Sequence, residues 1–190
     1  MKAVAGAAAV VPVTLGGLYV TTDVRHSHGI ASEESSAIGG LMQILAGQIQ
    51  FYREPRYGSG RRVFANPHDG RGYVDLFETP RGERLALINE SVAKARHGGE
   101  PHFGYYYYSL WGDADGQPYD PAIEFAVCAV PARFSVTGRN MFVMDTGGIV
   151  YQALPSQVWP GIGRGDRVPP LRTFPSAAEL AKNWIAVGNG

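Results

Sequence analysis

The chain has 190 residues, 45% of them apolar, a composition that supports one ordinary hydrophobic core. Its 17 acidic and 17 basic residues balance, which removes the electrostatic basis for a nucleic-acid partner or for attraction to an anionic lipid surface. The single cysteine, Cys128, excludes an intrachain disulfide.

The N-terminal segment is apolar. After Lys2, residues 3–22 carry no charge, and twenty helical residues span about 30 Å, the thickness of the hydrocarbon core of a bilayer. A membrane anchor and a cleaved signal peptide are both compatible with a basic start and an apolar centre. Small residues in this segment would let a second helix approach closely. These are Gly6, Ala7, Gly16 and Gly17.

A predicted helix at residues 32–52 follows a polar connector at residues 23–29. Glu33 and Glu34 fall in its first turn, where the helix dipole favours acidic side chains. Apolar residues then recur at spacings of three and four: Ile38, Leu41, Met42, Leu45, Ile49 and Tyr52. Because three glycines lower the intrinsic stability of this helix, we expect packing against a sheet to hold it.

The middle of the chain is predicted to form a short helix at residues 84–95 and then a strand at residues 103–111. Four consecutive tyrosines at residues 105–108 place two rings on each face of this strand. The favoured interpretation is a half-buried sheet with phenol hydroxyls at its rim. An aromatic platform for sugars or bases is the alternative.

A loop with the sequence Asp-Ala-Asp-Gly-Gln-Pro-Tyr-Asp follows at residues 113–120. Calcium prefers clusters of carboxylate oxygens, so Asp113, Asp115 and Asp120 are candidate calcium ligands. Asp and Gly are also the residues that a wide turn requires. The sequence indicates no other cofactor.

Three further strands are predicted at residues 122–130, 141–144 and 149–151, the last two joined by a glycine-containing hairpin turn. Beyond residue 154 the chain is rich in proline and is predicted to be peripheral. Ser176 and Glu179 form a capping box that begins a short helix ending at residue 184.

These elements predict an α+β fold in which a long N-terminal helix packs on a small antiparallel sheet of about four strands. A C-terminal loop and short helix complete the fold. Residues 1–29 are expected to form an anchor or signal-like segment with its connector, and residues 30–190 one domain.

Residues 31–41 have the sequence Ala-Ser-Glu-Glu-Ser-Ser-Ala-Ile-Gly-Gly-Leu, a small-residue run that contains two glutamates. This run resembles the segment that follows the membrane half of the long helix in type IV pilin-like and type II secretion pseudopilin-like proteins of bacteria. The segments 104–108, 125–134 and 137–151 resemble their sheet. That sheet has a strand, an A-x-P corner, a T-G-x-x-x-F strand and a D-x-x-G-x-[IV]-[YR] hairpin in succession. The Gly-Phe-Thr-Leu-Ile-Glu type processing motif of such proteins does not occur in this sequence.

The resemblance implies a noncatalytic bacterial envelope protein held at the inner membrane, with its domain in the periplasm or at the cell exterior. It would act by assembly with itself or other pilin-like subunits, or by contact with secretion machinery. Leu41 and Leu45 would join the small N-terminal residues in assembly or anchoring.

The alternative function is an anchored extracytoplasmic binding module for a glycan, a peptide or a calcium ion. Catalysis is not expected, because the sequence contains no G-x-S-x-G, H-E-x-x-H, P-loop or paired-carboxylate motif.

Overall fold

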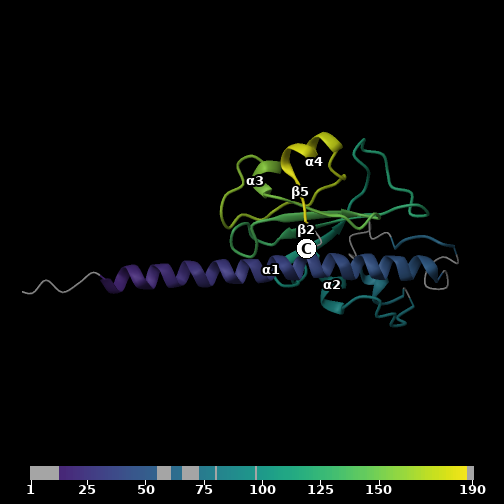
Figure 1. Cartoon of the computed structure of the whole chain (residues 1–190). Coiled ribbons are helices and arrows are strands. Elements are labelled where there is room, and N and C mark those ends of the chain that lie inside the picture. Colours follow the sequence, from purple (N-terminus) through teal and green to yellow (C-terminus); the bar gives the residue numbers. More distant parts are fainter. Residues whose placement is uncertain (1–12, 55–60, 66–72, 80, 97, 188–190) are drawn as a thin grey trace, which may run out of the picture.

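The structure is a computed structural model that describes residues 13–54, 61–65, 73–79, 81–96 and 98–187, with side chains from Gly29 onward. It has an α+β fold, as predicted: a long helix, α1, lies against one face of an antiparallel sheet (Figure 1). Helix α1 spans Val13–Arg53. The strands are β1 (Tyr105–Ser109), β2 (Ala126–Pro131), β3 (Met141–Asp145), β4 (Val150–Ala153) and β5 (Ile185–Ala186).

The sheet is a meander in which the strands lie in their sequence order, β1-β2-β3-β4-β5, and every neighbouring pair is antiparallel. Strand β2 lies second from the edge and all of its residues are buried. Cover on both faces explains its continuous apolar sequence. Four strands correspond to the prediction, and β5, with two residues, is an addition to it.

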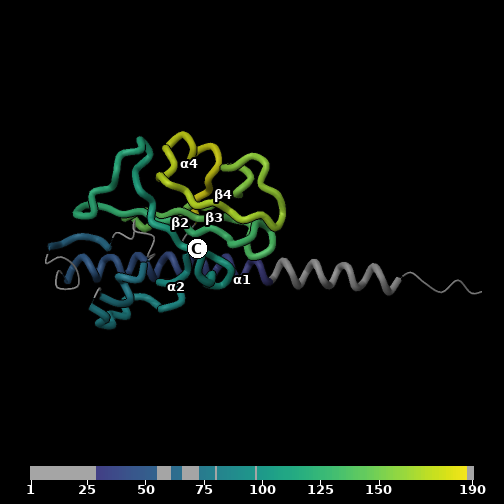
Figure 2. The backbone as a smooth tube through the Cα atoms, turned by 180° about the vertical axis from the view of Figure 1, so that it is seen from behind, coloured from purple at the N-terminus to yellow at the C-terminus, as the bar shows by residue number. Residues whose placement is uncertain are grey.

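The first core lies between α1 and the sheet. Helix α1 contributes four fully or nearly fully buried side chains to it, which are Ala37, Leu41, Ile44 and Phe51. Tyr105, Tyr107 and Phe142 face them from the sheet. On another side of α1 lie the 3-10 helix η2 (Val74–Leu76) and helix α2 (Glu90–Lys94), so that α1 is held between two layers (Figures 1 and 2).

The second core covers the opposite face of the sheet. Residues from the C-terminal part of the chain pack on this face, with Val168 and Trp184 buried there. Helices α3 (Pro155–Val158) and α4 (Ala177–Asn183) belong to this layer. The prediction of a peripheral tail is therefore wrong, because apolar residues of this tail pack against the second face of the sheet. The predicted capping box is confirmed: the Ser176 hydroxyl accepts the Glu179 N–H at 3.3 Å.

Three predicted boundaries differ from the structure. Helix α1 continues without interruption through residues 23–29, where a polar connector was expected. The helix expected at residues 84–95 is shortened to α2, because Leu85 and Ala86 donate backbone hydrogen bonds to the Phe77 carbonyl instead. The second strand begins at Ala126 rather than at residue 122, since the preceding residues form a turn.

Within the described part of the chain, no helix combines the length and the apolar composition that a membrane crossing requires. Of the predicted anchor at residues 3–22, the first half lies outside the described residues and the second half lies in α1. Gly6 and Ala7 lie outside the described residues, and Gly16 and Gly17 lie in α1 at positions where only the backbone is described.

Candidate functional site

One side of α1 is covered neither by the sheet nor by α2, and we call it the outer face. It is defined by five exposed residues at alternating spacings of four and three: Ser35, Gly39, Met42, Ala46 and Ile49. The side chains of Met42 and Ile49 are 36% and 37% exposed. No residue between Glu34 and Arg53 is charged, so the face is a neutral, mainly apolar strip about four turns long.

The hydroxyls near the N-terminal end of this strip are satisfied within the helix. Ser35 Oγ donates to the Ala31 carbonyl at 3.0 Å, and Ser36 Oγ donates to the Ser32 carbonyl at 2.9 Å. A serine bonded to its own helix presents little unmet polarity to a neighbour. The strip is therefore more apolar than its sequence suggests.

Close packing with β1 fixes the rotation of α1 about its axis. The Tyr107 hydroxyl donates to the Ala37 carbonyl at 3.3 Å, and its ring occupies the space that a Cβ on Gly40 would take. Gly47 makes a second close approach, because a Cβ there would lie 2.7 Å from Cγ2 of Ile88. These two glycines direct one side of the helix inward and thereby leave the outer face exposed.

Glu34 fixes the position of α1 along the sheet. Its Oε1 accepts hydrogen bonds from the backbone N–H groups of Arg139 and Asn140 at 2.8 and 2.9 Å, and its Oε2 accepts from Asn140 Nδ2 at 3.2 Å. Tyr105 donates to the Asn140 carbonyl at 2.9 Å and so holds the same loop from the sheet. We call Glu34 with the loop at Arg139 and Asn140 the carboxylate clamp.

Near its C-terminal end, α1 holds a loop through a buried amide. Gln48 is fully buried; its Nε2 donates to the Ala65 carbonyl at 2.7 Å, and its Oε1 accepts the Ala65 N–H at 2.8 Å. The Gln48 carboxamide thus pairs with both backbone groups of Ala65, as the backbone of a neighbouring strand would. Sequence analysis missed this residue, since a glutamine in a helix is ordinarily assigned to the solvent side.

Two of the residues assigned to assembly lie under the sheet rather than at a free surface. Leu41 is fully buried in the core, so it cannot contact another subunit. Leu45 is partly buried and packs against that core, close to the turn at Gly148. Two other members of the predicted apolar stripe, Met42 and Ile49, lie on the exposed side of α1 instead.

The predicted calcium ligands, Asp113, Asp115 and Asp120, lie in a hydrogen-bonded loop. Within the described ranges, no three His, Cys, Asp or Glu side chains come together as a group that could hold a metal ion. Asp113 Oδ1 instead accepts the N–H groups of Asp115 and Gln117 at 2.9 and 2.8 Å, and Asp120 Oδ1 accepts that of Ala122 at 2.9 Å. These contacts shape the loop, in agreement with the alternative prediction that Asp and Gly occur here because a wide turn requires them.

The tyrosine strand places two rings on each face, as predicted, but it offers no open platform. Tyr105 and Tyr107 pack under α1, and Tyr106 is buried on the opposite face. Burial raises the pKa of Tyr105 and of Tyr107, and the nearby carboxylates of Glu34 and Glu33 add to the rise at Tyr105.

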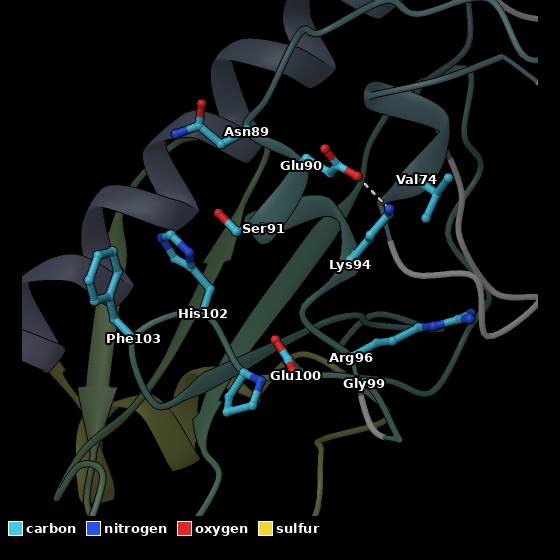
Figure 3. Close-up of a pocket in the computed structure, with 11 residues that line it drawn as sticks. Val74, Asn89, Glu90, Ser91, Lys94, Arg96, Gly99, Glu100, His102 and Phe103 are labelled. Carbon is cyan, nitrogen blue, oxygen red and sulfur yellow. Dashed lines mark hydrogen bonds and ion pairs between the residues drawn. The ribbon is translucent and has the colours of Figure 1, made fainter.

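A wide groove lies beside α2, with a volume of about 1150 Å³ (Figure 3). Asn89, Glu90, Ser91 and Lys94 line it from α2 and its N-cap, and the loop before β1 lines it from the other side. The described residues of this groove include none from the outer face of α1. The sequence did not indicate this groove, because its lining residues, mostly between Asn89 and Phe103, share no motif.

Comparison with known proteins gives no family. No family model, no curated protein and no solved structure matches the chain. The candidate surfaces therefore stand on geometry alone.

Proposed function

We propose that this protein is a noncatalytic subunit that assembles through α1, in the manner of a type IV pilin or type II secretion pseudopilin. The partners would be copies of itself or other pilin-like subunits, at the bacterial inner membrane with the domain in the periplasm or outside the cell. Contact with secretion machinery is part of the same proposal.

The observation that supports it best is the outer face of α1. A surface helix of a monomer ordinarily carries charged residues on its solvent side. Here eighteen consecutive residues between Glu34 and Arg53 are uncharged, and the exposed ones are small or apolar except for Gln50. Small residues allow helix backbones to approach closely, and head-to-tail contacts of this kind extend into an open fibre.

The packing of α1 on the sheet also fits this role. The carboxylate clamp, the Tyr107 hydroxyl bond and the Gln48 pair fix the translation and rotation of the helix relative to the sheet. A helix fixed in this way presents the same face in every copy. Repeated assembly requires such uniformity, since each subunit must offer its neighbour an identical surface.

The experiment that tests the proposal places charges on the outer face. We expect the full chain in mild detergent to sediment as oligomers or fibres, and the double variant Met42→Glu, Ile49→Glu to sediment as a monomer. Two buried carboxylates at a helix contact are strongly unfavourable. Sedimentation velocity measures the result, with circular dichroism to show that the fold persists.

The matched control is Ile123→Glu, which makes the same substitution at a side chain that is 69% exposed and lies outside α1. It should assemble as the parent chain does. A full-length parent chain that is monomeric, or a double variant that assembles like the control, would contradict the proposal.

A further inference from the structure

The tip of the turn that leads into β1 carries an exposed aromatic ring in an unfavourable backbone conformation. His102 and Tyr105 exchange backbone hydrogen bonds of 2.9 and 3.0 Å, which makes Phe103 and Gly104 the two central residues of a tight turn. Both have positive φ, 44° and 78°. Such turns favour Asn, Asp or Gly at the first central position, and a bulky residue there is strained.

Burial does not compensate for this strain, because the Phe103 side chain is 61% exposed. The ring is nevertheless held in place: the His102 ring meets it edge-on, with 4.6 Å between the ring centroids. Figure 3 shows the two rings side by side at the groove. A strained residue that gains little from packing is most simply explained by a ligand that uses its exposed surface.

The opposite wall of the groove supplies neutral hydrogen-bonding groups. Asn89 occupies the N-cap position of α2 but its side chain makes no capping hydrogen bond, which leaves its carboxamide available. Ser91, two residues further along, is exposed. Figure 3 shows both on the side of the groove that faces His102.

The charges around the groove compensate one another. Glu90 and Lys94 form an ion pair, and Arg96 and Glu100 add one charge of each sign to the lining. Partial burial lowers the pKa of His102, so its imidazole is neutral at pH 7. The groove therefore has little net field to attract a polyanion or a polycation.

We propose that this groove binds a neutral oligosaccharide, whose apolar ring face stacks on Phe103 while its hydroxyls bond to Asn89 and Ser91. A pyranose ring combines one apolar face with a rim of hydroxyls, which matches the aromatic carbon of Phe103 opposite the uncharged donors and acceptors of Asn89 and Ser91. The volume of about 1150 Å³ exceeds the roughly 300–1,000 Å³ of ordinary small-molecule pockets. It therefore suits several linked rings rather than one small molecule.

The test is a titration of the isotope-labelled full chain with cellohexaose, chitohexaose and maltohexaose, followed by nuclear magnetic resonance. We expect saturable shifts at residues 89–91 and 102–105 with at least one of the three. Phe103→Gly should weaken that binding at least about tenfold. The same substitution should raise the melting temperature, because glycine adopts the positive φ without strain.

The matched control, Ile123→Ala, shortens a different exposed apolar side chain and should leave the affinity unchanged. Absence of binding for all three hexasaccharides would overturn the proposal. So would shifts confined to residues outside the groove, or unchanged affinity in Phe103→Gly. The result does not depend on assembly, because the charged outer-face variant keeps the groove intact and should bind equally.

Discussion

Gly40 allows α1 to lie unusually close to β1. A Cβ at this position would lie 2.1 Å from the Tyr107 hydroxyl oxygen and 2.5 Å from its Cζ, distances that no relaxed packing permits. The adjacent Gly39 belongs to the outer face, and a Cβ there would meet nothing within 4 Å. Two neighbouring glycines in one helix thus have opposite structural roles.

These roles predict opposite effects for the same substitution. Gly40→Ala should lower the free energy of unfolding by about 1–3 kcal/mol, because the added methyl overpacks the helix against Tyr107. Gly39→Ala should raise it by about 0.5–1 kcal/mol, because alanine is the better helix former at an open position. Urea denaturation of both variants measures the difference. Equal effects of the two substitutions would contradict the packing described for α1.

The sequence predicted poorly which individual residues of α1 face the core. The spacing of apolar residues identified the helix correctly, yet it placed Met42 and Ile49 on the packed side, whereas both are exposed. The true inward side includes Gly40 and Gln48, one with no side chain and one polar. The apolar periodicity of a helix counts only apolar side chains. It therefore misses an inward position that is occupied by glycine, which has no side chain, or by the polar amide of glutamine.

At the scale of elements, the carboxylate clamp joins the first helix to the loop between β2 and β3. Glu34→Ala should lower the free energy of unfolding by about 1–2 kcal/mol, because the N–H groups of Arg139 and Asn140 lose a charged acceptor. Glu34→Gln keeps an acceptor oxygen and should lose less. Thermal melts followed by circular dichroism give the melting temperatures of the parent chain and the two variants. A higher melting temperature for Glu34→Ala than for Glu34→Gln would contradict the role of the carboxylate clamp.

Elements differed in how far sequence could predict them. The hairpin of β3 and β4 was predicted closely, because Gly147 and Gly148 mark the turn between two strongly apolar runs. Strand β5 was missed, since two exposed residues have no periodicity to detect. The start of β2 was predicted too early, because the apolar Ile123 looks like strand although hydrogen bonds to Asp120 hold that segment in a turn.

At the scale of the whole molecule, a buried thiol and buried phenol groups predict that the protein loses stability at alkaline pH. Burial raises the pKa of Cys128 from its ordinary 9.0 to about 12, and it raises the pKa of Tyr73 and of Tyr105 as well. Above pH 9 the unfolded chain releases protons that the folded chain keeps, so the unfolded state binds fewer protons and stability falls as pH rises. The stability contributed by the thiol is complete below pH 9 and is lost between about pH 9 and 12.

At pH 10.5 the thiol alone should lower the free energy of unfolding by about 2 kcal/mol relative to pH 7.5. Urea titrations at the two pH values measure this, and Cys128→Ala provides the control, in which the decline should begin nearer the ordinary tyrosine pKa of 10.0. An unchanged denaturation midpoint between the two pH values would mean that these groups are not buried as described.

The α+β class and the order of elements followed from the sequence because helical and strand periodicities occupy separate stretches of the chain. The cover on the second face of the sheet did not follow. A proline-rich segment gives no periodic pattern, although Val168 and Trp184, within and after it, are buried against that face. The groove beside α2 was likewise not predicted, since the loop that follows α2 forms its second wall without any recognisable motif.

Strand β5 has a consequence for how the protein matures. Its pairing with β4 follows α4 in the chain, and Val187 then donates a backbone hydrogen bond to the Val150 carbonyl at 2.8 Å. While the polypeptide is being synthesised, β4 is consequently left with open hydrogen-bonding groups until more than thirty further residues have emerged. During that interval β4 is a site at which two immature chains can pair with each other, and the late arrival of β5 ends that exposure.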